Sequence, residues 1–193
     1  MVGSKIDSLL VDISSRLEEG KGPAKDNLAV FLEEIKEVME NFFEESTNRD
    51  NRGKLRLSAV GREDRKLWYD YHGYEKEPLS TDARIKFCFG HLLEAFVLLL
   101  VKEAGHSVKD CQKEVTVGQV KGHIDCMIDG ELVDVKSASP YGFKKFVDGS
   151  ILKGDDPFGY LYQLSSYGKA LKKEKGYFLS IDKSGGGLNL LEG

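Results

Sequence analysis

The stretch GHIDCMIDGELVDVKS, residues 122–137, decides the fold that we expect for this chain. Its apolar residues form two short runs, and the dipeptide Asp129-Gly130 lies between them. Such a dipeptide is typical of a two-residue type I′ turn between antiparallel strands, because both turn positions require a positive φ. The stretch therefore predicts a β-hairpin in which Ile128 pairs with Glu131.

The same register places like charges opposite each other. Counting back from the turn puts Asp125 opposite Asp134 and His123 opposite Lys136. Because side chains alternate along a strand, these four side chains are expected on one face of the hairpin. The other face is expected to carry apolar residues: Ile124, Val133 and Val135. Directly opposed like charges destabilise a sheet, so a positive charge is expected between the two carboxylates.

The composition of the 193-residue chain is typical of a soluble globular protein, with 40% hydrophobic and 31% charged residues. We expect a helical extension over residues 1–48 and a core over residues 55–193. The first residues do not resemble a signal peptide, and the longest apolar run, AFVLLLV, is too short to span a bilayer. An intracellular, cytoplasmic protein without membrane contact is therefore expected.

The distribution of charge and the number of cysteines indicate which partners and which metal sites to expect. The formal net charge is -4, yet basic side chains are in excess between residues 49 and 66, which fits a polyanionic partner. The three cysteines form no CxxC pair. This usage favours a reducing compartment and argues against a cysteine-bound zinc or an iron–sulfur cluster.

Apolar spacing and cap residues outline the other elements. Residues 83–104 predict a long helix with its N-cap supplied by Ser80-Thr81-Asp82, and because it is apolar nearly all round we expect it to be the central buried helix. Further helices are expected over 5–19, over 24–45, before Gly73, and over 156–173 with Pro157 at its first position. Strands are expected over 112–117, 176–181 and 188–191, and a long loop, suited to a lid or strand guide, over 138–155.

Packing alone does not explain Glu94, which lies in the apolar segment FGHLLEAFVLLLV. An ionised carboxylate there costs free energy unless it is paired with a cation or bound to a metal. An ion pair with an Arg or Lys remains open. Together with Asp125 and Asp134, however, Glu94 would supply a third carboxylate for one Mg²⁺ or Mn²⁺ ion. Lys136 would then lie beside the metal. A metal acts as a Lewis acid and activates water, and a lysine offsets charge on the phosphate, so the two together are suited to phosphodiester hydrolysis.

These residues resemble the PD-(D/E)XK nuclease superfamily, although Ile124 stands where the family name has proline. The resemblance implies an α/β, restriction-endonuclease-like core with a mixed central β-sheet flanked by helices. It also implies a Mg²⁺ site, in which Mn²⁺ substitutes, and a lysine, Lys136, that assists the attacking water. The implied metal ligands are Glu94, Asp125, Asp134 and the Val135 carbonyl. His91, one helical turn before Glu94, is open between a role at the metal and helix packing.

A downstream segment, YLYQLSSYGKAL, resembles the QxxxY motif of the RecB-like and lambda-exonuclease-like branch of that superfamily. The resemblance implies that Gln163 and Tyr167 position the DNA strand, whereas an ordinary helix side-chain pair is the structural alternative. The segment RLSAVGREDRKLWY is similar to an N-terminal block of phage-type exonucleases. Phosphate contacts are expected from basic and hydroxyl side chains: Arg56, Arg62, Arg65, Ser137, Lys144 and Lys145.

The leading prediction is a Mg²⁺-dependent deoxyribonuclease that acts as an exonuclease on linear DNA ends, in recombination, repair or phage DNA processing. Two alternatives stay open. One is an endonuclease or junction resolvase with the same core, and the other is a nucleic-acid-binding module with this fold and no turnover. DNA is the expected partner, and a homo-oligomer and a phage origin remain open.

Overall fold

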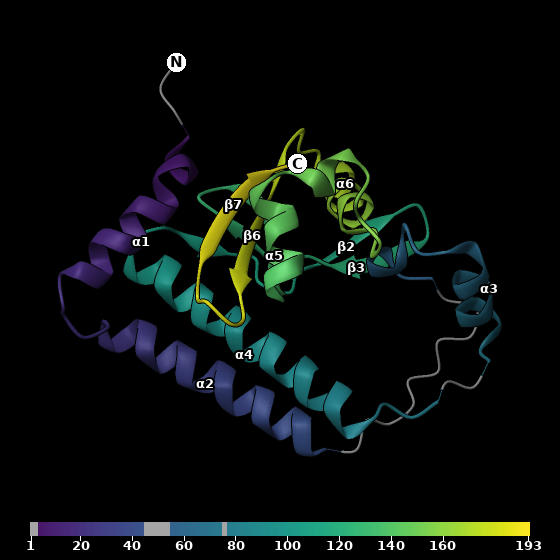
Figure 1. Ribbon diagram of the computed structural model, residues 1–193, viewed down its shortest axis with the longest axis horizontal. Helices are drawn as coiled ribbons and strands as arrows, with labels where there is room; N and C mark the ends of the chain where they lie inside the picture. The colour runs from purple at the N-terminus through teal and green to yellow at the C-terminus, as the bar shows by residue number, and fades with distance from the viewer. Residues whose placement is uncertain (1–3, 45–54, 75–76) are drawn as a thin grey trace.

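The computed structural model describes residues 4–44, 55–74 and 77–193. These residues form a mixed α/β fold around a five-stranded sheet with the strand order β1-β4-β5-β6-β7 (Figure 1). The strands are β1 Val108–Lys109, β4 Cys126–Ile128, β5 Glu131–Ala138, β6 Gly176–Asp182 and β7 Leu188–Glu192. β5 and β6 run parallel, and the other neighbours run antiparallel. The predicted mixed central sheet flanked by helices is confirmed.

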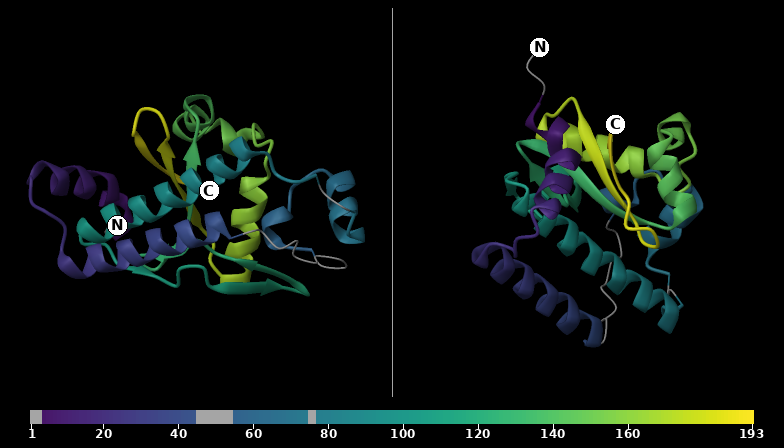
Figure 2. Two further views of the ribbon diagram at one scale, coloured as in Figure 1. Left: turned by 90° about the horizontal axis from the view of Figure 1, so that it is seen from below. Right: turned by 60° about the vertical axis from the view of Figure 1, so that its left-hand side comes forward.

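A second, two-stranded sheet and the helices complete the fold. The small sheet pairs β2 Glu114–Val117 with β3 Val120–His123. The α-helices are α1 Leu9–Glu18, α2 Lys25–Phe43, α3 Asp64–His72, α4 Thr81–Glu103, α5 Pro140–Val147 and α6 Tyr160–Leu171. Single 3₁₀ turns are η1 Lys5–Ser8, η2 Leu57–Ala59 and η3 Ser150–Lys153. Figures 1 and 2 show α2 and α4 side by side beneath the sheet, and α3 apart from it.

The hydrophobic core lies on both faces of β5. On one face, Val133 packs in a cluster with Val101 of α4. On the other, Leu132 packs with Phe178 of β6 and Tyr167 of α6. β5 is therefore covered on both sides, as expected for a strand with a parallel neighbour. Among the described helices, none is both long and apolar enough to cross a bilayer.

The two N-terminal helices differ in burial. α1 and the turn before it contribute Ile6, Leu9 and Ile13 to the same cluster as Val133. α2 has no fully buried residue and leaves Leu32 55% exposed. The predicted helices over 5–19 and 24–45 are thus present, and the first belongs to the core of the sheet.

A buried histidine fastens α1 to the hairpin turn. His106 follows α4 and is only 4% exposed. Its Nδ1 lies 2.5 Å from Asp129 Oδ2, and its Nε2 lies 3.1 Å from Asp12 Oδ2 on α1. Ser107 N also donates to Asp129 Oδ1 at 3.0 Å. The Asp129 side chain, 4% exposed, therefore has partners on both oxygens, and nothing in the sequence pattern indicates this role for His106.

The long helix forms as predicted, but only its second half is central. Ser80 Oγ accepts a hydrogen bond from Ala83 N at 3.2 Å, which confirms the cap. Val97 is fully buried against the sheet cluster. In the first half, Phe87 and Phe89 are 59% and 56% exposed. The expectation of a helix buried all round is wrong, because only the C-terminal turns reach the sheet.

The hairpin register is confirmed around the turn. Ile128 pairs with Glu131, and the ladder runs back to the pair of Cys126 and Val133. Asp129 and Gly130 have φ values of 50° and 86°, as a type I′ turn requires.

The register does not continue back to His123, which pairs with Glu114 in the small sheet and not with Lys136. The chain leaves β4 before Cys126, where Ile124 N donates to Lys113 O at 3.1 Å. Ile124 consequently packs in the cluster of Leu132, on the face opposite Val133. The predictions for His123 and for the face of Ile124 are therefore wrong, because a third strand, β3, precedes the hairpin.

The expected loop over 138–155 is also wrong. Ser139 Oγ caps Gly142 N at 3.2 Å, Pro140 occupies the first turn, and α5 buries Phe146 in the core. The segment is thus a packed helix followed by a 3₁₀ turn. The lid or strand guide that we expected from a long loop therefore has no loop to form it. The next helix begins at Tyr160 and not at Pro157.

Gly122 predicts a measurable packing cost. A Cβ on Gly122 would lie 2.7 Å from Leu57 Cβ and 2.9 Å from Tyr167 Cε1. Gly122→Ala is therefore expected to lower the free energy of unfolding by about 1–3 kcal/mol, measured by urea denaturation. Gly142→Ala is the matched control, since its Cβ would meet its nearest atoms at 3.5 Å and lies in a helix. An equal loss in both variants would contradict the prediction.

Candidate active site

Four of the predicted residues gather where α4, the segment before β4 and β5 meet. Asp134 and Lys136 lie two positions apart on β5 and so share a face of the strand. Asp125 directly precedes β4, and Glu94 lies on α4. Burial raises the pKa of Glu94 to about 7, with the negative charge of Asp125 adding to the rise and Lys136 opposing it. The fold therefore brings all four groups within electrostatic reach.

Asp134 is the most buried charged group of the cluster, at 1% exposed. Lys136 Nζ lies 2.5 Å from Asp134 Oδ2. The contact is an ion pair without hydrogen-bond geometry, so neither Asp134 oxygen has a hydrogen-bond partner among the described residues. Burial raises the pKa of Asp134 to about 7, Lys136 lowers it, and Asp125 raises it again. The raised pKa shows that the ion pair with Lys136 does not offset the cost of burying this carboxylate, so the position is not explained by folding stability.

Lys136 keeps its charge in this setting. Burial favours the neutral amine, but the carboxylates of Asp134 and Asp125 hold the pKa of Lys136 above its ordinary value. The side chain is therefore a hydrogen-bond donor and a source of positive charge, and not a proton acceptor at neutral pH.

Asp125 is held at the point where the β4–β5 ladder stops. Its Oδ2 accepts a hydrogen bond from Val135 N at 2.8 Å. The carboxylate takes the place of a backbone acceptor, because the chain before Cys126 has turned away from β5. This bond fixes one oxygen of Asp125 beside the strand that carries Asp134 and Lys136.

Two neighbours hold Glu94. Gln112 Nε2 donates to Glu94 Oε1 at 3.2 Å, and His91 Nδ1 lies 3.9 Å from Glu94 Oε2. The His91 side chain is 67% exposed, so it reaches Glu94 from the solvent side. Sequence reasoning missed Gln112, since nothing in its surroundings marks a residue that folds back onto a distant helix.

The chemistry of the donors fits a hard divalent cation, which prefers carboxylate and carbonyl oxygens. The observation that supports the fit is Asp134, whose two buried oxygens make no hydrogen bond of good geometry and have Lys136 as their charged neighbour. As the side chains lie, no group of three or more His, Cys, Asp or Glu residues within 4–44, 55–74 and 77–193 is arranged to hold a metal ion. Occupation would therefore require the side chains to adjust.

The predicted Gln163 and Tyr167 pair forms on α6. Gln163 Nε2 donates to the Tyr167 hydroxyl at 3.1 Å. Tyr167 is 1% exposed, and burial raises its pKa, with Asp134 and Asp125 adding to the rise. The Tyr167 ring thus packs in the core, and its hydroxyl lies within electrostatic reach of the carboxylates.

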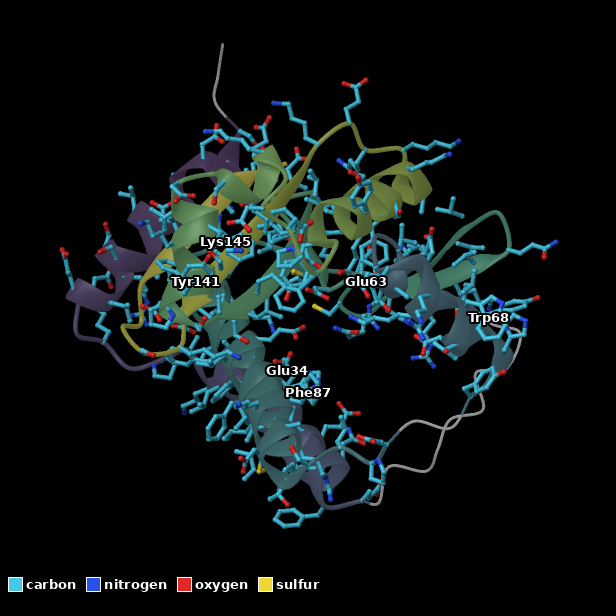
Figure 3. All side chains as sticks on the ribbon, turned by 45° about the vertical axis from the view of Figure 1, so that its right-hand side comes forward. Glu34, Glu63, Trp68, Phe87, Tyr141 and Lys145 are labelled. Carbon is cyan, nitrogen blue, oxygen red and sulfur yellow. The ribbon has the colours of Figure 1, made fainter. Side chains whose placement is uncertain are left out.

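The predicted phosphate-contacting residues are dispersed. Arg56, Arg62, Arg65 and Lys144 are exposed, and Ser137 is half-buried. Arg65 lies on α3, with its guanidinium 5.8 Å from the Tyr69 ring centroid. Lys145 Nζ lies 2.5 Å from Asp155 Oδ1 and 5.1 Å from the Tyr141 ring centroid; Figure 3 shows Tyr141 and Lys145 close together on α5.

Tyr160 is a neighbour of the cluster that sequence reasoning missed. Lys136 Nζ lies 5.0 Å from the centroid of its ring, within the range of a cation–π contact. Arg62 also acts on this residue, since its charge opposes the burial that raises the pKa of Tyr160. Arg62 therefore has an electrostatic link to the surroundings of the cluster.

Stability in the absence of divalent cations is expected to fall as the pH rises. The ordinary pKa values of Glu94 and Asp134 are 4.5 and 3.8, and both rise to about 7 on folding. Between these values the folded chain binds more protons than the unfolded chain, so the free energy of unfolding decreases with pH. Urea denaturation in EDTA should therefore show lower stability at pH 8 than at pH 5. A smaller fall is expected in Asp134→Asn, and an equal fall would assign the effect to other groups.

Comparisons with known proteins give similarities to solved structures alone, since no protein-family model and no curated protein matches the chain. The crystal structure of SSO0001 is 16% identical, with a TM-score of 0.49 over 82% of this chain and 74% of that chain. An alkaline exonuclease from Laribacter hongkongensis, LHK-Exo, is 14% identical, with a TM-score of 0.49 over 79% and 81%. LHK-Exo in complex with dAMP is 14% identical, with a TM-score of 0.46 over 74% and 77%. The chemistry of this chain has to come from its own side chains.

Proposed function

We propose that this chain is a Mg²⁺-dependent deoxyribonuclease that hydrolyses phosphodiester bonds, acting as an exonuclease on linear DNA ends. The observation that carries the proposal is Asp134, a buried carboxylate paired only with Lys136 among the described residues, in one cluster with Asp125 and Glu94. Such a cluster is costly for folding and suited to metal-assisted hydrolysis. Recombination, repair or phage DNA processing would supply such ends.

The carboxylates and Lys136 have different roles in the proposed reaction. Glu94, Asp125 and Asp134 would hold the cation, together with the Val135 carbonyl, and Mn²⁺ would substitute for Mg²⁺. A bound divalent cation supplies Lewis acidity and a water of lowered pKa. Lys136, charged and directed by its ion pair with Asp134, stabilises the negative charge that develops on the phosphate.

The strand itself is placed by other side chains. Gln163 and Tyr167, joined by their hydrogen bond, would position the DNA strand beside the cluster. Exposed basic side chains would contact phosphates, which fixes the position of the DNA without selecting a sequence. His91 would assist Glu94 from the solvent side.

The test compares linear DNA with covalently closed circular DNA, each incubated with Mg²⁺ or with EDTA. Loss of linear DNA that requires Mg²⁺, with the circle intact, is the expected result. Nicking of the circle would replace the exonuclease with an endonuclease or junction resolvase. Binding of DNA in a gel-shift assay without digestion of either form would leave a nucleic-acid-binding module and refute the catalytic proposal.

A further inference from the structure

A row of aromatic rings leads from Lys136 to the surface. The Tyr160 ring centroid lies 5.0 Å from Lys136 Nζ. The Phe158 ring stacks on Tyr160, with 5.3 Å between centroids and 28° between the ring planes. Phe146 stacks on Tyr160 at 6.4 Å and 23°. The row therefore begins in the core, passes the lysine of the cluster and ends in Phe158.

Burial falls steadily along this row. Phe146 is 3% exposed, Tyr160 is half-buried, and Phe158 is 64% exposed. Single exposed aromatic residues are common on protein surfaces. Phe158 differs because its ring is held by stacking on a ring that touches the charged cluster. Its outer face is thus an ordered apolar surface a short distance from Lys136.

A close backbone contact joins this row to a basic residue. A Cβ on Gly159 would lie 2.8 Å from the Gly61 carbonyl carbon, and a Cβ on Gly61 would lie 2.9 Å from Tyr162 Cδ2. The loop that contains Gly61 therefore packs directly against the start of α6. This contact places the exposed Arg62, which follows Gly61 in the chain, next to the start of α6.

We propose that Arg62, Phe158, Tyr160 and Tyr162, here called the aromatic ledge, bind a base of an unpaired DNA strand next to the phosphate that is cleaved. The proposal rests on the proposed function and specifies its substrate as a single-stranded or frayed end. Aromatic rings beside cations are the usual means of holding single strands, because every base has a face to stack. Phe158 would stack on the base, and Arg62 would offset an adjacent phosphate.

The geometry favours an unpaired base over a duplex. Inside a duplex, each base face is covered by its neighbours, and only the outer face of the terminal pair is open, so a ring on the protein reaches an internal base only where the pairs are separated. Phe158 offers a ring face to solvent, and Tyr162, 64% exposed, adds a second apolar side chain from the first turn of α6. The ledge therefore discriminates by the accessibility of the base.

The experiment measures the fluorescence of 2-aminopurine at the end of a single-stranded oligonucleotide, with Ca²⁺ in place of Mg²⁺. The wild-type chain is expected to quench the fluorescence through stacking. Phe158→Ala should abolish the quenching and weaken single-strand binding about tenfold, with less than about a twofold change for relaxed, covalently closed circular duplex, which has no terminal base pair. Phe158→Trp should restore both the quenching and the affinity.

Phe43→Ala is the matched control, because Phe43 is 78% exposed and lies on α2. It should bind and quench as the wild type does. Absence of quenching by the wild type, or equal weakening for single strands and duplex in Phe158→Ala, would overturn the ledge. If the wild type cleaves DNA and Phe158→Ala binds and quenches as the wild type does, the nuclease proposal stands and the ledge proposal fails. If the wild type quenches the fluorescence but shows no Mg²⁺-dependent cleavage, the ledge binds DNA and the nuclease proposal fails.

Discussion

Asp134→Asn is expected to abolish DNA cleavage and, in the same protein, to raise the melting temperature in EDTA. Cleavage should fall about a thousandfold or more, because the substitution removes the charged oxygens of the central carboxylate. The rise in stability follows from burial. The Asp134 carboxylate is 1% exposed, and burial raises its pKa to about 7 in spite of its ion pair with Lys136. Asparagine keeps the shape of the side chain and removes the buried charge, while the negative charge of Asp125 still acts on Lys136.

The measurement combines a cleavage assay in Mg²⁺ with thermal unfolding in EDTA at pH 8, where the wild-type carboxylate is ionised. Asp129→Asn is the matched control on the same hairpin. The Asp129 side chain is 4% exposed, but it is partnered by His106 and Ser107. Its substitution should lower the melting temperature, because the free energy of unfolding falls by about 1–3 kcal/mol. A lower melting temperature in both variants would show that the Asp134 carboxylate stabilises the fold, and unchanged cleavage in Asp134→Asn would remove it from the catalytic cluster.

Lys136→Met is expected to lower cleavage about 100- to 1000-fold and to destabilise the protein in EDTA. Cleavage falls because the variant lacks the positive charge that stabilises the phosphate in the transition state. The loss of stability follows because Asp134 then keeps a buried charge without its cation, a change that costs about 3–5 kcal/mol in other proteins. The sign is opposite to that expected for Asp134→Asn, although both variants lose activity.

Thermal unfolding of Lys136→Met with and without Mg²⁺ provides a readout that does not depend on turnover. If the carboxylates hold the cation, Mg²⁺ should restore much of the lost stability, since it binds the folded state alone. In the double variant with Asp134→Asn, the cost of Lys136→Met should largely disappear. Lys169→Met, which removes an exposed lysine on α6, is the control. No restoration by Mg²⁺ and additive effects in the double variant would separate Lys136 from the proposed metal site.

Local signals in the sequence were sufficient for the hairpin and the long helix. The Asp129-Gly130 turn sets the register from Ile128 onwards because its chemistry depends on two adjacent residues. Ser80 predicts the start of α4 for the same reason. His123 was misplaced because its partner, Glu114, comes from a strand earlier in the chain that has no turn signal comparable to Asp129-Gly130.

The candidate site was predictable to the extent that charge is costly in a core. Glu94, Asp125 and Asp134 stand out in apolar surroundings, and the fold brings them together. Tyr160 and Gln112 could not be found in this way, because a tyrosine at the start of a helix and a glutamine in a polar stretch are ordinary. Their contacts with Lys136 and Glu94 arise from the crossover between β5 and β6 and from the turn before β2.

The bond between His106 and Asp129 has a consequence for how the molecule folds and opens. Asp129 belongs to the turn that aligns β4 with β5, and through His106 it is joined to Asp12 on α1. The first helix and the strand that carries Asp134 are therefore expected to exchange their amide hydrogens as one cooperative unit. Fraying of the N-terminal helix would loosen the alignment of the reacting groups before any other part of the sheet had opened.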